Sequence, residues 1–202
     1  MLTGSLGFAV TSLVGFGPWA FAAKWFYTNV GEGGLYLAST LFFLVSSGLL
    51  LHHLVEDPRP MCRFYSIFVP AFFAYAVVWC LAWFTLRFGA GEWLGSLLGT
   101  LAFVAIVGLG FRNFRGFVKV ALVMFVLHSA GYFMGGRLMH WVASPQGSEW
   151  LSFLSKSQLS VAAKLSWGLL YGLGFGAGIG YAFWMFQNRL HTSNQESASS
   201  PA

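Results

Sequence analysis

Long apolar stretches alternate with short polar connections over most of the chain. Charged residues divide it into six apolar blocks, each close to the ~20 residues that a helix needs to cross a bilayer. The blocks lack the regular apolar–polar alternation of a membrane-spanning barrel strand, so the pattern favours helices. The six predicted spans are residues 6–27, 34–54, 64–86, 93–111, 117–138 and 165–187.

Most connections between the blocks are only a few residues long. Short links make consecutive helices antiparallel neighbours, so the pattern predicts one helical bundle over residues 1–190. The final segment, residues 191–202, is polar and rich in Ser, and we expect it to be a disordered tail.

The connection at residues 139–164 is longer and carries a turn signal, Ser144-Pro145-Gln146-Gly147. Ser148 and Glu149 then provide a helix start, and apolar side chains follow on one face. We expect a short interfacial helix at residues 149–157 that lies on the membrane surface. A plain loop and an early start of the sixth span are the alternatives.

Composition points to the same fold class, an all-α integral membrane protein built as a six-transmembrane-helix bundle. Only 8% of the 202 residues are charged and 57% are apolar. Soluble domains carry about 25% charged residues, and a chain this poor in polar residues cannot build a water-exposed surface. A water-soluble enzyme, a disordered chain and a disulfide-stapled secreted domain are therefore excluded.

The lipid bilayer is the partner that the composition implies, and the basic residues predict the orientation of the chain in it. Six basic residues flank the spans on the side of the termini and three flank them on the other, which favours both termini in the cytoplasm. Although the net charge is +5, the basic residues are spread singly, so nucleic acid is not an expected partner. The two sets are Arg59, Arg63, Arg112, Arg115, Lys119 and Arg189, against Arg87, Arg137 and Lys156.

Glycines recur every four residues in three of the predicted spans. Such spacing makes a flat helix face that a second helix can approach closely. We expect these faces to pack the fourth, fifth and sixth spans together; room for a ligand and self-association are the alternatives. The glycines are Gly91, Gly95 and Gly99, then Gly131 and Gly135, and finally Gly168, Gly172, Gly176 and Gly180.

His128 lies near the middle of the fifth span, on the same helix face as Gly131 and Gly135. An ionisable group at that depth is a functional-site hypothesis by default. No Asp or Glu is expected inside any span, so burial favours the neutral imidazole. The structural alternative is a histidine that bonds Tyr132, Ser129 or a backbone carbonyl.

Four histidines in or beside the spans also raise the possibility of haem b, with His52, His53, His128 and His140 as ligands. Ideal helical rise separates His52 from His128 by ~13 Å in depth, and His128 from His140 by ~18 Å. The axial ligands of one haem need nearly equal depth, so haem is the weaker hypothesis. The pattern indicates no other metal site.

The sequence contains no HExxH, GxSxG or nucleotide-binding motif, so an enzyme is not expected. The predicted interior is apolar and aromatic, with few hydroxyls and one histidine. Our first hypothesis is a non-enzymatic membrane protein that binds or passes a small neutral or lipidic molecule, with His128, Tyr132, Gly131 and Gly135 at the site. The alternative is an accessory subunit of a larger membrane complex, which would dock through its glycine faces.

Overall fold

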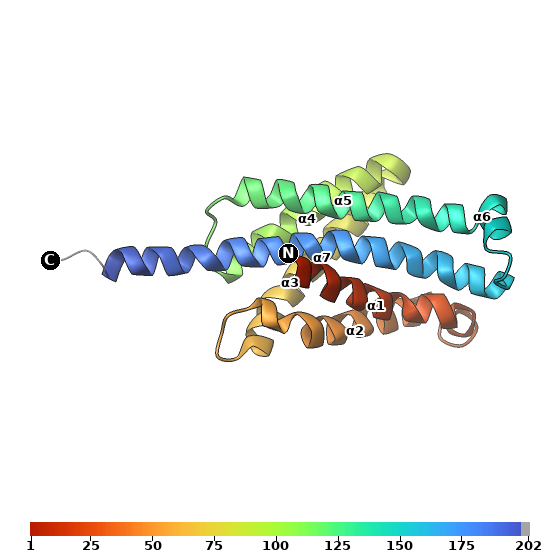
Figure 1. Ribbon diagram of the computed structural model, residues 1–202, viewed down its shortest axis with the longest axis horizontal. Helices are drawn as coiled ribbons and strands as arrows, with labels where there is room; N and C mark the ends of the chain where they lie inside the picture. Colours follow the sequence, from red (N-terminus) through yellow and green to blue (C-terminus); the bar gives the residue numbers. More distant parts are fainter. Residues whose placement is uncertain (199–202) are drawn as a thin grey trace.

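The computed structural model describes residues 1–198, and this part of the chain consists of helices and connections without a strand. Figure 1 shows the helices lying roughly along one axis, with α6 capping one end of the bundle. Their bounds are α1 Leu2–Asn29, α2 Glu32–Leu51, a 3-10 turn His52–Leu54, α3 Pro60–Leu86, α4 Phe88–Gly110, α5 Phe117–Val142, α6 Pro145–Trp150 and α7 Lys156–Ala198.

Within the described residues, six helices are long and apolar enough to cross a membrane, and they coincide with the six predicted spans. All of them except α5 begin earlier than expected, and the difference is largest for α4 and α7. Helix α4 starts at Phe88 instead of residue 93, so that Glu92 lies inside the helix, and α7 starts at Lys156 instead of residue 165. The expectation that no carboxylate lies within a span is therefore wrong for Glu92, and also for Glu32 at the first position of α2.

The short helix of the longer connection lies at Pro145–Trp150, so the prediction of residues 149–157 is wrong in its bounds. Ser144 caps this helix by accepting a hydrogen bond from the Gly147 amide at 3.1 Å. Pro145 suits the first turn because its fixed φ is helical and its missing N–H is not needed there. The predicted tail at 191–202 stays a prediction: α7 reaches Ala198, and residues 199–202 lie outside the described part.

Helix α7 is the central helix of the bundle. It lies between α1 and α5 and packs extensively against both, as Figure 1 shows. Helices α3 and α4 form a second closely packed pair, and α2 packs against α1. The backbones of α2 and α3 approach each other at few points, and Tyr65 of α3 joins the two helices by donating to the Leu44 carbonyl at 3.0 Å.

The four-residue glycine repeat of α7 faces α1. A Cβ atom added to Gly4 of α1 would lie 2.6 Å from the Gly176 carbonyl oxygen, and Gly180 contacts Gly4 as well. Further along, Gly172 lies against Ala9 and Ser12, while Gly168 lies against the Phe16 ring. The two backbones therefore approach more closely than any residue with a side chain would permit.

A second glycine face of α7 contacts α5. Gly174 packs on Gly131, where an added Cβ atom would lie 2.5 Å from the Leu170 carbonyl oxygen, and Gly135 packs on Trp167. The glycines of α4 have a different partner from the expected one, because they face α3. Gly91 lies against Trp83, Gly95 against Trp79, and Gly99 against Tyr75.

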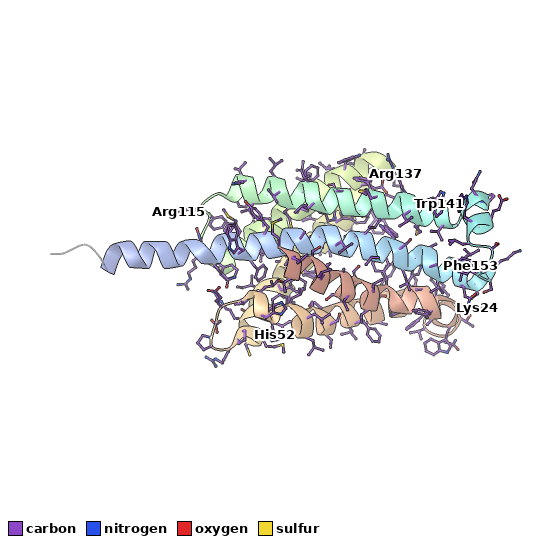
Figure 2. The ribbon with its side chains drawn as sticks, viewed as in Figure 1. Lys24, His52, Arg115, Arg137, Trp141 and Phe153 are labelled. Carbon is purple, nitrogen blue, oxygen red and sulfur yellow. The ribbon has the colours of Figure 1, made fainter. Side chains whose placement is uncertain are left out.

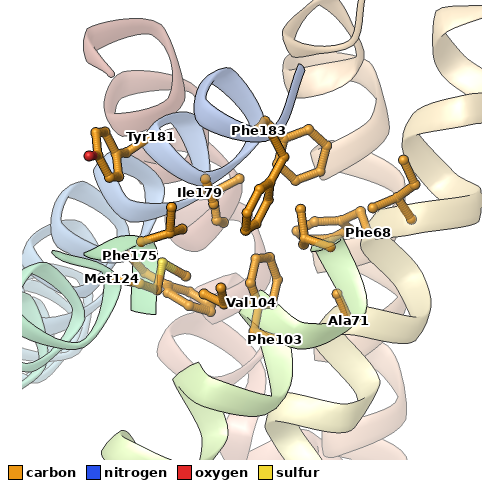
Figure 3. Packing of buried hydrophobic residues seen from close by; sticks show 14 of the residues in the cluster. Phe68, Ala71, Phe103, Val104, Met124, Phe175, Ile179, Tyr181 and Phe183 are labelled. Carbon is orange, nitrogen blue, oxygen red and sulfur yellow. The ribbon is translucent and has the colours of Figure 1, made fainter. Parts of the chain in front are cut away.

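An aromatic core fills the end of the bundle at which α1 begins. Figure 3 shows Phe68 of α3, Phe103 of α4 and Phe183 of α7 packed together with Met124. The rings of Phe64 and Phe68 stack at a centroid distance of 4.8 Å. Fully buried phenylalanines in this cluster are Phe8, Phe64, Phe68, Phe103, Phe175, Phe183 and Phe186.

Two buried amides tie the connections at this end to α7. The Gln187 side chain donates to the Leu54 carbonyl at 2.7 Å and accepts from the Glu56 amide at 2.8 Å. Asn113, between α4 and α5, donates to the Phe186 carbonyl at 2.9 Å. Helix α7 thus fixes both connections as well as the helices beside it.

We predict that Gly174→Ala destabilises the protein by about 1–3 kcal/mol, the usual cost of overpacking. An added Cβ atom would meet the Leu127 carbonyl oxygen and the Gly131 backbone, neither of which can move independently of its helix. The measurement is thermal unfolding in detergent. Gly136→Ala is the matched control, because a Cβ atom there meets nothing within 4 Å; equal stability of both variants would contradict the prediction.

Candidate functional site

His128 is fully buried in α5 and is hydrogen-bonded to a residue that sequence reasoning missed. Its Nε2 atom lies 2.8 Å from the hydroxyl of Tyr75 on α3. The Tyr171 hydroxyl of α7 lies 3.5 Å from the Tyr75 hydroxyl and extends the chain of polar groups. Three helices therefore meet at one buried hydrogen-bonded cluster. The hydrogen-bond partner of His128 is Tyr75, and neither Tyr132 nor Ser129 as expected.

Aromatic rings enclose the His128 imidazole. Tyr132, one turn along α5, stacks on it at a centroid distance of 6.0 Å and an interplanar angle of 11°. Tyr171 and Phe175, one turn apart on α7, meet it edge-on at 5.7 and 5.2 Å. No charged group contacts the ring within the described residues, so the surroundings favour the neutral form.

Several buried polar atoms around this cluster have no hydrogen-bond partner within the described part of the chain. They include the second ring nitrogen of His128, Nδ1, and the Ser129 and Ser96 hydroxyls. The indole nitrogens of Trp79 and Trp167 are in the same condition. Buried polar groups are nearly always satisfied, so such a concentration marks a region where a further polar molecule would be stabilised.

Glu92 is the carboxylate of this region, and the sequence analysis placed it outside the spans. The Tyr132 hydroxyl donates to its Oε1 atom at 3.2 Å, which joins α5 to the first turns of α4. Tyr132 therefore contacts His128 through its ring and Glu92 through its hydroxyl. No sequence signal indicated Glu92, since the predicted block 93–111 is already close to span length without it.

Two cavities meet beside this cluster. The larger, which we call the α4–α5 cleft, has a volume of about 760 Å³ and opens between α4 and α5. Its lining is Glu92, Trp93, Phe125, Val126, Ser129, Ala130, Tyr132, Phe133, Met134, Gly136, Arg137, Met139, His140 and Trp167.

The smaller cavity, which we call the aromatic pocket, has a volume of about 220 Å³. Tyr132 and Trp167 line both cavities and form the wall between them. The remaining lining comes from α1, α2, α3 and α7, and is Phe16, Phe43, Phe72, Tyr75, Ala76, Trp79, Cys80 and Tyr171.

The four residues predicted for the site have different places. Tyr132 lines both cavities, whereas His128 lies behind Tyr132 and Tyr75 and lines neither. Gly131 and Gly135 pack against α7 and serve the helix interface. No sequence signal could single out Tyr75 or Tyr171 among the many aromatic residues of the spans.

The candidate haem ligands are spread along the bundle. His52, beside His53, donates from Nδ1 to the Gly48 carbonyl at the end of α2, and His140 donates from Nδ1 to the Gly136 carbonyl. Figure 2 shows His52 at the end of the bundle opposite to Trp141, the neighbour of His140. Among the described residues, no three His, Cys, Asp or Glu side chains come together as a metal site.

Comparison with models of known protein families, with curated proteins and with solved structures finds no match to this chain. The function must therefore be argued from the site itself.

A double-mutant cycle tests the Tyr75–His128 hydrogen bond. Tyr75→Phe leaves the buried His128 imidazole without its partner, and His128→Leu leaves the Tyr75 hydroxyl only its 3.5 Å contact with Tyr171, whereas the double variant removes both groups. We expect a coupling free energy of about 1 kcal/mol, the scale of hydrogen bonds between helices in membranes. The four proteins are compared by thermal unfolding in one detergent; strictly additive effects would show that the contact contributes nothing.

Proposed function

We propose that this chain is a non-enzymatic, multi-pass membrane protein that binds a small neutral or lipidic molecule in the α4–α5 cleft beside His128. The observation that carries the proposal is the cleft itself. Its volume of about 760 Å³ falls in the range of ligand sites, and its lining is mostly apolar with a few polar groups. An apolar molecule, or the acyl chain of a lipid, would need no charged partner there.

Membrane insertion is supported by what the helices expose. Large apolar side chains are exposed along the outside of α1, α2, α3 and α5, among them Phe21, Phe42, Phe73 and Leu122. In water such continuous apolar surface would drive aggregation, whereas in a bilayer it is solvated by lipid.

The structure favours binding over passage through the bundle. Both cavities lie toward the end that carries α6, and the aromatic core closes the other end. A molecule that enters from the side, between α4 and α5, meets Tyr132 and Trp167. We therefore assign His128 an indirect role, in which it holds Tyr75 and Tyr132 in place behind the site.

The accessory subunit stays an alternative hypothesis. The glycines expected to dock a partner contact α1, α3, α5 and α7 of the same chain, so a partner would need another surface.

Filling the cleft should prevent binding. Gly136 lines the cleft, and a Cβ atom there meets nothing within 4 Å, so Gly136→Leu projects a side chain into the open space without disturbing the helices. The probe is azi-octanol, a neutral alcohol with a photoreactive diazirine. We expect its cross-linking to α5 residues 125–133 to fall about fivefold or more, because overpacking costs about 1–3 kcal/mol.

Gly33→Leu is the matched control, since Gly33 is also helical with open space around it and lies outside the cleft. It should label residues 125–133 as the unchanged protein does. Equal labelling of the Gly136→Leu protein would overturn the proposed site.

The proposed orientation, with both termini in the cytoplasm, can be tested on a cysteine the chain already has. Cys62 is exposed at the beginning of α3, the end at which the basic connections gather, and Figure 2 shows Arg115 at that end. In a Cys80→Ser background, a membrane-impermeant maleimide should leave Cys62 unlabelled in intact cells and label it after lysis. Phe153→Cys, at the opposite end, should react in intact cells; the reverse pattern would invert the orientation.

A further inference from the structure

The lining of the α4–α5 cleft changes in character along α5. At the end near α6 it includes Arg137, an exposed cation, and His140. Figure 2 shows Arg137 near the end of the bundle that carries Trp141. Arg137 forms no ion pair or hydrogen bond with any described residue, so its guanidinium is free to bind an anion.

The middle of the cleft is polar without net positive charge. The Ser129 hydroxyl is buried and has no hydrogen-bond partner among the described residues, although Ser129 lines the cleft. Glu92 lies at the same level and accepts a hydrogen bond from Tyr132. The middle of the cleft therefore suits the uncharged ester and glycerol oxygens of a lipid better than it suits an anionic group.

The deepest part of the cleft is apolar. Phe125 and Val126 line it from α5, and Trp93 packs over it from α4, with its ring 6.2 Å from that of Phe125 and 4.3 Å from that of Phe133. Along α5 the lining begins with Phe125 and Val126, continues with the polar Ser129 and Tyr132 among apolar side chains, and reaches the cation Arg137 near α6.

The length of the cleft matches one leaflet of a bilayer. Its α5 lining extends from Phe125 to His140, which is ~22 Å at 1.5 Å per residue. A leaflet with its head groups is about 20 Å thick, half of the full bilayer. The cationic end lies near the end of α5, where head groups of the adjoining leaflet would be.

We propose that the occupant of the cleft is a single anionic phospholipid of the adjoining leaflet, with its phosphate on Arg137 and one acyl chain against Trp93 and Phe125. The proposal rests on the proposed function and names its ligand class. It does not depend on which side of the membrane this end faces.

Native mass spectrometry of the full chain, released from detergent, measures the lipid that stays bound. The probes are palmitoyl-oleoyl phosphatidylglycerol and palmitoyl-oleoyl phosphatidylcholine at equal concentration, which share acyl chains and differ in net charge. We expect phosphatidylglycerol to be retained about fivefold over phosphatidylcholine, since one cation contributes about 1 kcal/mol toward an anionic lipid. Arg137→Gln should abolish this preference.

Arg87→Gln is the matched control, because Arg87 is an exposed arginine at the same end of the bundle and does not line the cleft. It should keep the preference. Loss of the preference in both variants, or in neither, would overturn the phospholipid assignment. The proposed function would still stand if the protein retains both lipids and Gly136→Leu prevents their retention. If the unchanged protein retains neither lipid and azi-octanol does not label the cleft, the proposed function fails as well.

Discussion

Close backbone contact between α7 and its two neighbours is the constraint on which the rest of the structure depends. Glycines on opposite faces of α7 allow α1 and α5 to approach until backbone atoms touch. With α1 and α5 held this way, α2 packs against α1, and α4 packs against α3 and α5. The position of His128, and of both cavities, follows from where α5 is fixed.

Tight packing at one end and open space at the other have the same origin in side-chain size. Glycines and fully buried phenylalanines fill the region where α1 begins. Toward α6, the large indole and phenol rings of Trp93, Tyr132 and Trp167 line the two cavities. Rigid rings that cannot interdigitate fully leave clefts between helices, and such clefts are where ligands of helical membrane proteins can be accommodated.

The sequence was sufficient for the number and approximate position of the long helices, because span length and charge are local properties. Helix partners were not predictable from it. The spacing of Gly91, Gly95 and Gly99 specifies close approach, yet says nothing about whether the approaching helix is α3 or α5. The burial of His128 was likewise predictable from periodicity, whereas its partner Tyr75 comes from a helix 53 residues away. Glu92 was missed because an acidic residue was taken to end an apolar block, although Tyr132 solvates it inside the helix.

The central helix is also the last of the long helices in chain order, and this has a consequence for biosynthesis. A ribosome delivers α1 to α5 first. Until α7 joins them, the glycine faces of α1 and α5 are uncovered, and the buried tyrosine–histidine cluster lacks one of its three helices. The earlier helices can pair as α1 with α2 and α3 with α4, but α7, which joins α1 to α5, is not yet present. A quality-control factor that recognises uncovered small-residue faces could therefore act between the synthesis of α5 and the synthesis of α7.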